Sequence, residues 1–299
     1  MKAIQALSKD FFRENAYPIA LRSIHGDQHY QHPGDLTDID HWHDFAELVI
    51  ITEGYGIHSI DGIDYPVSAG DIFVFQGKTR HYFKERHGLS MHNIMYDARR
   101  LQHSFKNLQN DAGYNAMFLL EPAYRRRHRF KSRLRISRRL LAHAETIIHR
   151  IRDEQDKQLP GYDSLMLSML LELMVLFSRQ YSKVEIPQAQ ALYRIGKIIS
   201  RLETQYKKDW KIEQLTKVAG MSKSSLIATF KNVVGYSPID YLIRIRLQKA
   251  AGLLVETQDS VGEITVQCGF HDSNYFARQF RRVYNCSPWQ FRKNNRTIS

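Results

Sequence analysis

Three histidines and a glutamate in the N-terminal part of the chain have side chains that could act together as ligands. His41, His43 and Glu47 alternate with one another and with Phe45, so on a β-strand all of them face the same side of the sheet. His81 follows at the far end of a later predicted strand. If they converge, three imidazoles and one carboxylate could bind a divalent metal. The sequence leaves open the alternative that they hydrogen-bond to one another or to a polar effector.

The C-terminal part of the chain repeats itself, and the repeated unit has the pattern of a DNA-reading motif. Residues 211–221 return 49 residues later as residues 260–270. Each copy predicts a helix, a tight turn at a glycine and a second helix that begins at a capping residue. We expect the two helix-turn-helix motifs at about 211–235 and 260–285. In such a motif the second helix fits the major groove of DNA.

Charge favours a DNA-binding domain over an ordinary all-helical domain for this repeat. Residues 189–299 contain 18 lysines and arginines against 8 aspartates and glutamates, which accounts for nearly all of the chain's net charge of +12. Neutralisation of phosphates requires such an excess of cations. We therefore predict that double-stranded DNA is a partner of this region.

The buried faces of the two second helices determine which of their side chains could contact DNA. In the second copy Phe276 and Phe280 face the core, so Asn274 and Arg278 lie on the opposite face. Asparagine suits adenine and arginine suits guanine, whereas Asp272 stands at the helix start, where an N-cap is the favoured role. The candidate DNA-binding residues are Ser222, Ser224, Ser225, Ala228, Lys231, Asp272, Ser273, Asn274, Arg278 and Arg281.

These C-terminal residues resemble the two-motif DNA-binding domain of AraC/XylS transcription regulators. The resemblance covers about 100 residues and depends on three stretches. They are residues 215–222 with the Phe-Lys pair at 230–231, residues 264–282, and the Ser-Pro-Trp-Gln-Phe-Arg sequence at 287–292. The resemblance implies a seven-helix domain that reads two successive faces of the major groove and regulates transcription.

Residues 1–120 have a different composition and the pattern of a β-rich domain. They contain 11 lysines and arginines against 15 aspartates and glutamates, and ten of the 14 histidines. Short β-rich runs alternate with Glu-Gly, Asp-Gly and Ala-Gly-Asp turn signals, which is typical of a small barrel or sandwich. The predicted strands are residues 45–52, 56–60, 65–67, 71–75 and 90–95.

The order of ligands and glycines in this region resembles the cupin fold. The positions that fit the two cupin motifs are His41, His43, Glu47, Gly54, Gly70 and His81. Gln76 departs from the second motif, where the family usually has proline. The resemblance implies a β-barrel whose usual metal ligands correspond to His41, His43, Glu47 and His81. The other histidines of the region, His58 and His92 among them, are expected to be ordinary surface or structural residues.

Four stretches together look most like the rhamnose-responsive regulators of the AraC/XylS family. They are residues 43–50, the Gly-Asp-Ile-Phe sequence at 70–73, residues 93–96 and residues 272–276. This resemblance implies a sugar-type effector. It would also allow Asp272 to contact a cytosine base.

Two apolar helices are predicted between the domains. The first has a stripe of Leu141, Ala144, Ile148 and Ile151, and the second, after Pro160, carries Leu167, Leu171, Met174 and Phe177. A helix that is apolar over so wide an arc must bury two faces, and in the resembling family this region is the dimer contact. Core packing within one chain is the alternative. Just before these helices, the basic run at 125–131 is expected to be a solvated loop or helix start.

The chain therefore divides into predicted regions of an α+β multidomain protein. They are a cupin-like barrel at 1–120, a helical dimerisation segment at 121–181, a linker at 182–190 and the DNA-binding domain at 191–299. Residues 1–17 carry charges and no apolar run, so we expect a soluble, cytoplasmic protein without a signal peptide. The two cysteines, Cys268 and Cys286, suggest neither a disulfide nor a zinc site.

The sequence as a whole predicts a sequence-specific transcription regulator that responds to a small effector, which we expect to be a sugar. We expect a homodimer with no catalytic residues and no required cofactor, and with RNA polymerase as a further partner if the protein is an activator. The alternative function is a metal-dependent cupin enzyme fused to a DNA-binding module.

Overall fold

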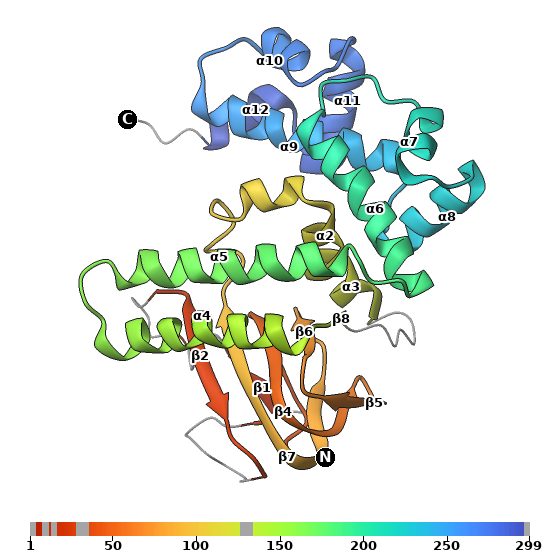
Figure 1. The fold of residues 1–299 in the computed structure, drawn as a ribbon. Helices are drawn as coiled ribbons and strands as arrows, with labels where there is room; N and C mark the ends of the chain where they lie inside the picture. The colour runs from red at the N-terminus through yellow and green to blue at the C-terminus, as the bar shows by residue number, and fades with distance from the viewer. Residues whose placement is uncertain (1–3, 8–11, 13–16, 28–35, 126–133, 296–299) are drawn as a thin grey trace. The chain divides into compact units, whose positions relative to one another are not determined.

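The structure, a computed structural model, describes residues 4–7, 12, 17–27, 36–125 and 134–295 of the 299-residue chain. Its tertiary contacts separate two compact units, Met1–Tyr193 and Arg194–Ser299 (Figure 1). The first unit combines a sheet with helices, and the second unit is helical. Each unit has a hydrophobic core of its own.

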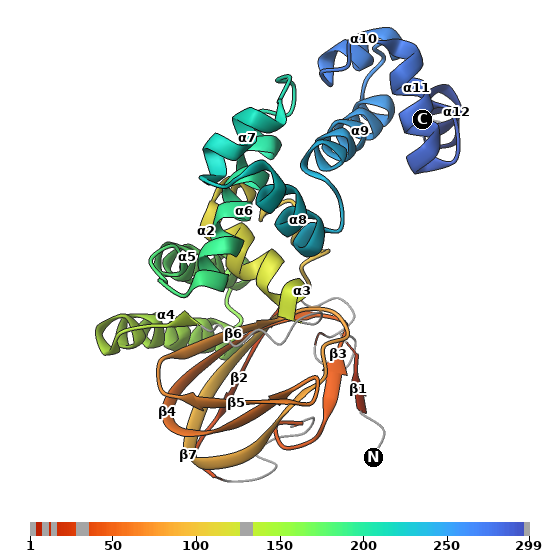
Figure 2. The same cartoon turned by 90° about the vertical axis from the view of Figure 1, so that its right-hand side faces the viewer.

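The first unit is built on a curved eight-stranded sheet (Figure 2). The strands are β1 (Ile4–Ala6), β2 (Ile19–Ile24), β3 (His41–His43), β4 (Ala46–Ile60), β5 (Ile63–Ser68), β6 (Asp71–Phe75), β7 (His81–Tyr96) and β8 (Leu134–Arg135). Their order is β1-β3-β7-β4-β6-β8, with β2 paired to β7 and β5 paired to β4. Neighbouring strands pair antiparallel, except β1 and β3, which are parallel.

One long strand, β4, replaces two strands that the sequence predicts at 45–52 and 56–60. The prediction of a turn between them is wrong, because Gly54 adopts a φ of +69° within a bulge and pairing with β7 continues on both sides of it. A Cβ atom at Gly54 would lie only 2.3 Å from the carbonyl oxygen of Gly88 on β7. Glycine is needed here both for the positive φ and for the close approach of the two backbones.

The irregular pairing changes which residues of β4 face the core. Register shifts occur between Ile51 and Tyr55 and again before His58. Val49 at an odd position and Ile60 at an even position consequently belong to the same buried cluster. In a regular strand these two residues would face opposite sides of the sheet, because side chains alternate with a period of two.

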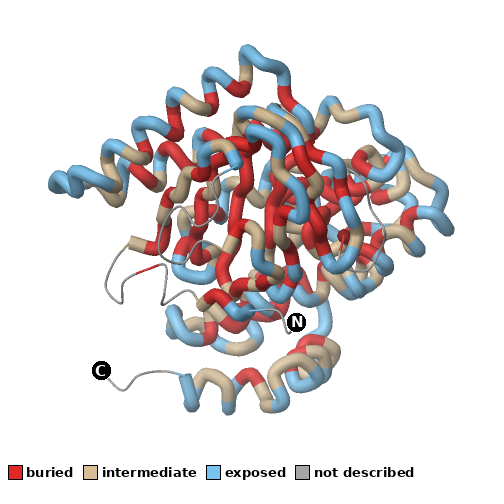
Figure 3. Tube along the Cα trace, turned by 90° about the horizontal axis from the view of Figure 1, so that it is seen from below, coloured by how far each residue is buried: buried red, intermediate tan, exposed pale blue. Residues whose placement is uncertain are grey.

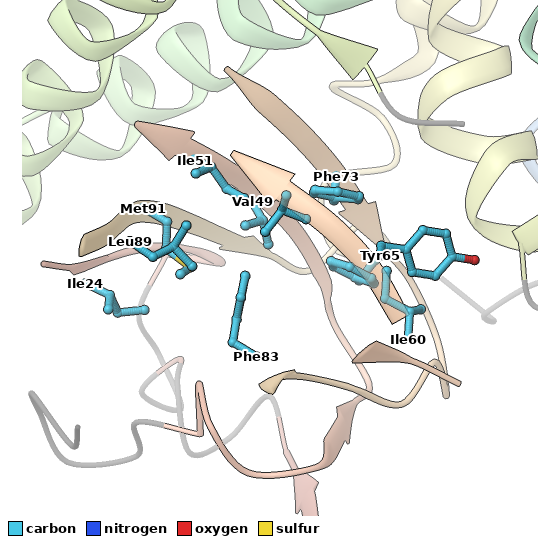
Figure 4. Close-up of a cluster of buried hydrophobic side chains, with 11 residues drawn as sticks. Ile24, Val49, Ile51, Ile60, Tyr65, Phe73, Phe83, Leu89 and Met91 are labelled. Carbon is cyan, nitrogen blue, oxygen red and sulfur yellow. The ribbon is translucent and has the colours of Figure 1, made fainter. Parts of the chain in front are cut away.

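Apolar side chains of five strands fill the concave side of the sheet (Figure 4). Their removal from water is the main favourable term in the stability of this unit. The buried cluster consists of Ile24, Val49, Ile51, Ile60, Tyr65, Val67, Phe73, Phe75, Phe83, Leu89 and Met91.

Helices cover the sheet in the rest of the first unit. They are η1 (Lys106–Asn110), α2 (Ala112–Tyr114), η2 (Asn115–Leu120), α3 (Glu121–Arg125), α4 (Arg138–Lys157) and α5 (Tyr162–Tyr181). The long helices α4 and α5 form an antiparallel pair beside the sheet (Figure 1). Buried and exposed residues recur along the helices with helical spacing (Figure 3). The predicted stripe on α4 is confirmed, since Leu141, Ala144, Ile148 and Ile151 are all buried.

The structure decides two predictions about this helical region. Met174 of α5, for which the sequence left open a dimer contact or core packing, is 0% exposed and belongs to the chain's own core. Arg125 is not in a solvated loop, and that prediction is wrong. This residue is buried at the end of α3, where it donates to the carboxylate of Glu121 and the carbonyl of Val74. The rest of the basic run, at 126–131, lies outside the described residues.

The second unit contains the two predicted motifs. Its helices are the part of α6 (Pro187–Thr204) from Arg194 on, α7 (Ile212–Ala219), α8 (Lys223–Val234), α9 (Pro238–Glu256), α10 (Val261–Gln267), α11 (Ser273–Tyr284) and α12 (Pro288–Asn295). The helix α6 begins inside the range predicted as a linker. None of the described helices, in either unit, combines the length and the apolar content needed to cross a membrane.

Local capping signals placed the boundaries of the motif helices correctly. Ser222 caps α8 and Asp272 caps α11, each through a side-chain oxygen that accepts backbone N–H groups. The two helices end at Gly235 and Asn285, which have φ values of +89° and +56°. These predictions are confirmed.

A substitution at Gly54 should test the bulge. Gly54→Ala combines a positive φ with a clash against β7, so we expect it to lower the free energy of unfolding by about 3 kcal/mol or more. Gly62→Ala is the matched control, because Gly62 has a φ of +77° and open space where its Cβ would lie. That variant should lose only about 1 kcal/mol. Denaturant unfolding of the two purified variants measures the difference, and equal losses would contradict the close approach.

Candidate effector pocket and DNA-reading surfaces

Three of the four predicted ligand residues meet in the first unit. The Nε2 atom of His43 lies 3.1 Å from Oε2 of Glu47 and 3.1 Å from Nε2 of His81. Oε2 of Glu47 and Nε2 of His81 are 3.5 Å apart. All three side chains are buried, and β3, β4 and β7 each supply one of them. We call His43, Glu47 and His81 the triad.

The orientation of His43 places two hydrogen-bond acceptors, its Nε2 atom and the carboxylate of Glu47, next to each other. The Nδ1 atom of His43 lies 2.8 Å from the carbonyl oxygen of Phe45, which can only accept, so Nδ1 carries the hydrogen. In a neutral imidazole Nε2 then presents a lone pair. That lone pair faces the carboxylate of Glu47, another acceptor. A proton or a bound cation between the two groups would remove the repulsion.

His41 lies beside the triad without joining it. Its Nδ1 atom contacts the carbonyl oxygen of Ile39 at 2.7 Å, and its ring centroid lies 4.4 Å from that of His81. Among the described residues, the group of mutually close potential ligand atoms contains His43, Glu47 and His81 only. The fourth predicted ligand therefore packs against the triad, where it lines the adjoining pocket.

His58 is a member of this cluster that the sequence did not indicate. Its Nε2 atom lies 3.4 Å from Nδ1 of His81, and its ring stacks on Phe83 with centroids 4.1 Å apart. The side chain is fully buried. Regular alternation along β4 would place His58 opposite Glu47, and the shifted register brings both to the same side. Only the glycine at position 54 hints at this change in the sequence.

Burial keeps the imidazoles of His81, in the triad, and of His41, beside it, neutral. Loss of solvation holds the pKa of His81 well below its ordinary value, and the neighbouring His41 and His43 lower it further. The pKa of His41 is also lowered, chiefly by burial. A neutral imidazole keeps one lone pair for a hydrogen atom or a cation, which suits the ligand role.

A pocket opens next to the triad and is lined by both polar and apolar side chains. Arg22 on β2 and Asn93 on β7 contribute polar groups that are paired in the sheet register. Oδ1 of Asn93 is buried and has no hydrogen-bond partner among the described residues. A buried acceptor without a partner costs free energy that a ligand hydroxyl could recover. The apolar part of the lining includes Ile24, Val49, Phe83 and Met95.

In the first motif, α8 exposes the predicted face. Leu226, Phe230 and Val233 are buried, which orients the helix. The predicted residues Ser222, Ser224, Ser225, Ala228 and Lys231 are all exposed. This surface offers hydroxyls and small side chains with a single cation at Lys231.

In the second motif, α11 exposes a more strongly basic face. Phe276 and Phe280 are fully buried, and the predicted residues Asp272, Ser273, Asn274, Arg278 and Arg281 are exposed. Arg282, which the sequence analysis did not select, lies with Asn274, Arg278 and Arg281 around one shallow surface depression. The carboxylate of Asp272 accepts the N–H groups of Asn274 and Tyr275, and these hydrogen bonds lower its pKa.

Comparisons with known proteins agree with both units. Residues 28–171 match the family model of the AraC-like ligand binding domain, and residues 215–294 match a helix-turn-helix domain. The chain is 26% identical to the HTH-type transcriptional activator RhaR of Mannheimia succiniciproducens, over 97% of this chain and 96% of that protein. It is 26% identical to the protein of the same name from Escherichia coli (strain K12), over 98% of this chain and 97% of that protein.

The matched regions coincide with the two sets of functional residues. The triad and its pocket fall in the part that matches the ligand-binding model, and α8 and α11 fall in the part that matches the helix-turn-helix model. The chain therefore combines an AraC-like ligand-binding domain with a helix-turn-helix domain, and it is a DNA-binding transcriptional regulator homologous to the RhaR activators over nearly its whole length.

Proposed function

We propose that the protein is a transcriptional activator whose effector is a small polyhydroxylated compound, a sugar, bound in the pocket next to the triad. The observation that carries this proposal is the polar lining of that pocket, which includes the buried Glu47 and the buried, unpartnered Oδ1 of Asn93. Glu47, Asn93 and Arg22 offer acceptors and donors to hydroxyl groups, and Phe83 offers an apolar surface. The names of the two relatives support activation. An activator must contact RNA polymerase, which we therefore propose as a partner in the cytoplasm.

The triad also fits a divalent cation. Its three ligand atoms are 3.1 to 3.5 Å apart. Tetrahedral coordination with bonds of about 2.0–2.2 Å requires ligand separations of roughly 3.3–3.6 Å. His43, Glu47 and His81 would hold the ion, which would neutralise the carboxylate and present an open position to a ligand oxygen. This fit favours a second candidate function, a metal-dependent cupin enzyme, which predicts turnover of a sugar by the full chain in the presence of the metal.

We propose that the two motifs read DNA together and that the protein acts as a homodimer. Both recognition helices expose polar faces in one compact unit, which suits two successive major-groove segments about 10 bp apart.

On α5, Leu165 is 45% exposed, and Leu171, Val175 and Leu176 are partly exposed on the same side of the helix. The exposed side of α5 thus carries apolar surface alongside the polar Ser168, Glu172 and Arg179, and this apolar surface supports a dimer contact through α5, within the predicted dimerisation segment at 121–181.

The first prediction for this function separates base reading from phosphate anchoring. Arg278→Ala should weaken binding to the preferred DNA by about 1–3 kcal/mol and relax the preference at one base pair. Lys231→Ala should weaken all sequences alike and reduce the salt slope by about one. Binding of both variants to a library of DNA sequence variants measures the difference. An unchanged relative preference in Arg278→Ala would make Arg278 a phosphate contact.

The second prediction concerns the triad. Glu47→Gln preserves the shape of the side chain but removes the negative charge that lies next to His43, so this variant and His43→Ala should lose the thermal shift produced by the effector. His87→Ala is the matched control, since His87 is exposed and stacks on Tyr55 away from the pocket. The probes are a panel of sugars, with and without chelator, and elemental analysis of the purified chain reports bound metal. An effector response that survives in Glu47→Gln would exclude the triad from the effector site.

The third prediction concerns the dimer. Leu171→Glu with Val175→Glu places charges on the partly exposed side of α5, so the chain should remain folded and become a monomer with weaker DNA binding. Met174→Glu is the matched comparison, because a charge at this fully buried position should unfold the first unit. Sedimentation and circular dichroism measure the two properties. A folded dimer in the double variant would place the contact elsewhere.

A further inference from the structure

A short segment between α6 and α7 is held by a buried arginine of α9. Nε of Arg246 donates to the carbonyl oxygen of Tyr206 at 2.7 Å, and Nη2 donates to that of Lys208 at 2.9 Å. Nη2 also lies 3.4 Å from Oδ1 of Asp209. Arg246 is only 8% exposed, so these acceptors replace the water that its guanidinium has lost. The segment 206–209 is thereby fixed to the helix that joins the two motifs.

The same segment also contacts the turn of the second motif. A Cβ atom at Gly269 would lie 2.8 Å from Cα of Lys207, so the two backbones touch. Oδ2 of Asp209 lies 2.7 Å from Nε2 of His271, and the guanidinium of Arg246 lies 5.7 Å from the ring centre of Phe270. The hydrogen bond with His271 lowers the pKa of Asp209, so the interaction favours the charged carboxylate.

The segment therefore joins three parts of the second unit. It leads through Trp210 into α7 of the first motif, and the indole of Trp210 donates back to the carbonyl of Gln205. Arg246 connects it to α9, and Asp209 connects it to the turn before α11. We call Asp209, Arg246 and His271 the clasp.

The repeat shows that this connection is a property of the first copy. At the offset of 49 that relates residues 211–221 to 260–270, Asp209 corresponds to Gln258, and the nearest carboxylate in the second copy is that of Asp259. This carboxylate accepts a hydrogen bond from Gln267 at 2.9 Å, and that glutamine belongs to the same copy. Asp209 instead reaches a residue of the other copy. A bond inside one copy stabilises one motif, whereas a bond between copies constrains their relative orientation.

We propose that Arg246 and Asp209 are positioning residues that set the orientation of α8 relative to α11, and with it the spacing of the two DNA segments that the protein accepts. The proposal rests on the proposed reading of DNA by both motifs. Neither residue needs to touch DNA for this role. Once one motif is bound to DNA, binding of the other is an intramolecular step. If the orientation of the two motifs is already fixed, this step loses little conformational entropy, so the affinity for DNA depends on the clasp.

The test uses the full chain and DNA selected from a random-sequence library by the wild-type protein. Single base pairs are then inserted or deleted between the two protected segments, and each one shifts them by about 3.4 Å and rotates them by roughly 35°. Wild-type affinity should fall steeply with either change. The variants are Asp209→Ala and Arg246→Lys, since a lysine ammonium cannot reproduce the planar fork of donors. Asp259→Ala is the matched control.

In both clasp variants, affinity for the selected DNA should fall about tenfold, which corresponds to 1.4 kcal/mol. The further loss caused by an inserted base pair should shrink, while affinity for DNA with a single segment should equal that of the wild type. Asp259→Ala should keep the wild-type dependence on spacing. Should Arg246→Lys fail to fold, Asp209→Ala decides, because its carboxylate is 62% exposed.

Three results would overturn the proposal and can be told apart. A wild-type dependence on spacing that persists unchanged in Asp209→Ala excludes the clasp while leaving two-motif reading intact. A wild-type protein that is indifferent to spacing removes two-motif reading itself, and the clasp proposal with it. An equal loss of single-segment affinity in the clasp variants would make the clasp a stabilising contact without a positioning role.

Discussion

The antiparallel pairing of β4 with β7 is the constraint on which the ligand-binding unit depends. Every other strand pairs with one of these two strands or with a strand that does. The pairing is long because Gly54 absorbs an irregularity that would otherwise end it. The change of register then turns both Glu47 and His58 toward the same interior. The arrangement of Glu47 and His58 on either side of His81 is thus a consequence of how two strands pair, as much as of which residues they contain.

Buried polar groups with definite partners recur in both units. In the first unit, burial raises the pKa of Glu121, and the adjacent Arg125 opposes that shift. The guanidinium of Arg125 also lies near the rings of Phe73 and Phe75 in the core of the sheet. In the second unit, Arg246 is held mainly by backbone carbonyls. Such groups are costly to move, because each would leave partners without hydrogen bonds in an apolar setting.

The two recognition helices divide their work by composition. The face of α8 carries hydroxyls and one cation, whereas α11 carries Asn274 and three arginines in one patch. Arginine and asparagine can each make two hydrogen bonds to a single base edge, and serine cannot. Under the proposed function, α11 would supply more of the sequence preference. The first motif would contribute mainly contacts to the DNA backbone. It would also be a second point of attachment to DNA, and for that reason the relative orientation of the two motifs would affect affinity.

The sequence by itself determined the features that depend on neighbours a few residues away. Helix caps at Ser222 and Asp272, helix stops at Gly235 and Asn285, and the buried faces of α8 and α11 follow from local spacing. Only the tertiary structure decided that His58 joins the cluster, that His41 stands beside it, that Arg125 is buried, and that Asp209 reaches the other copy. These outcomes depend on strand register and on contacts between residues far apart in the chain, such as the 62 positions that separate Asp209 from His271. Local propensity carries no information about which distant group will be the partner, because the free energy of that choice comes from packing and desolvation in the folded state.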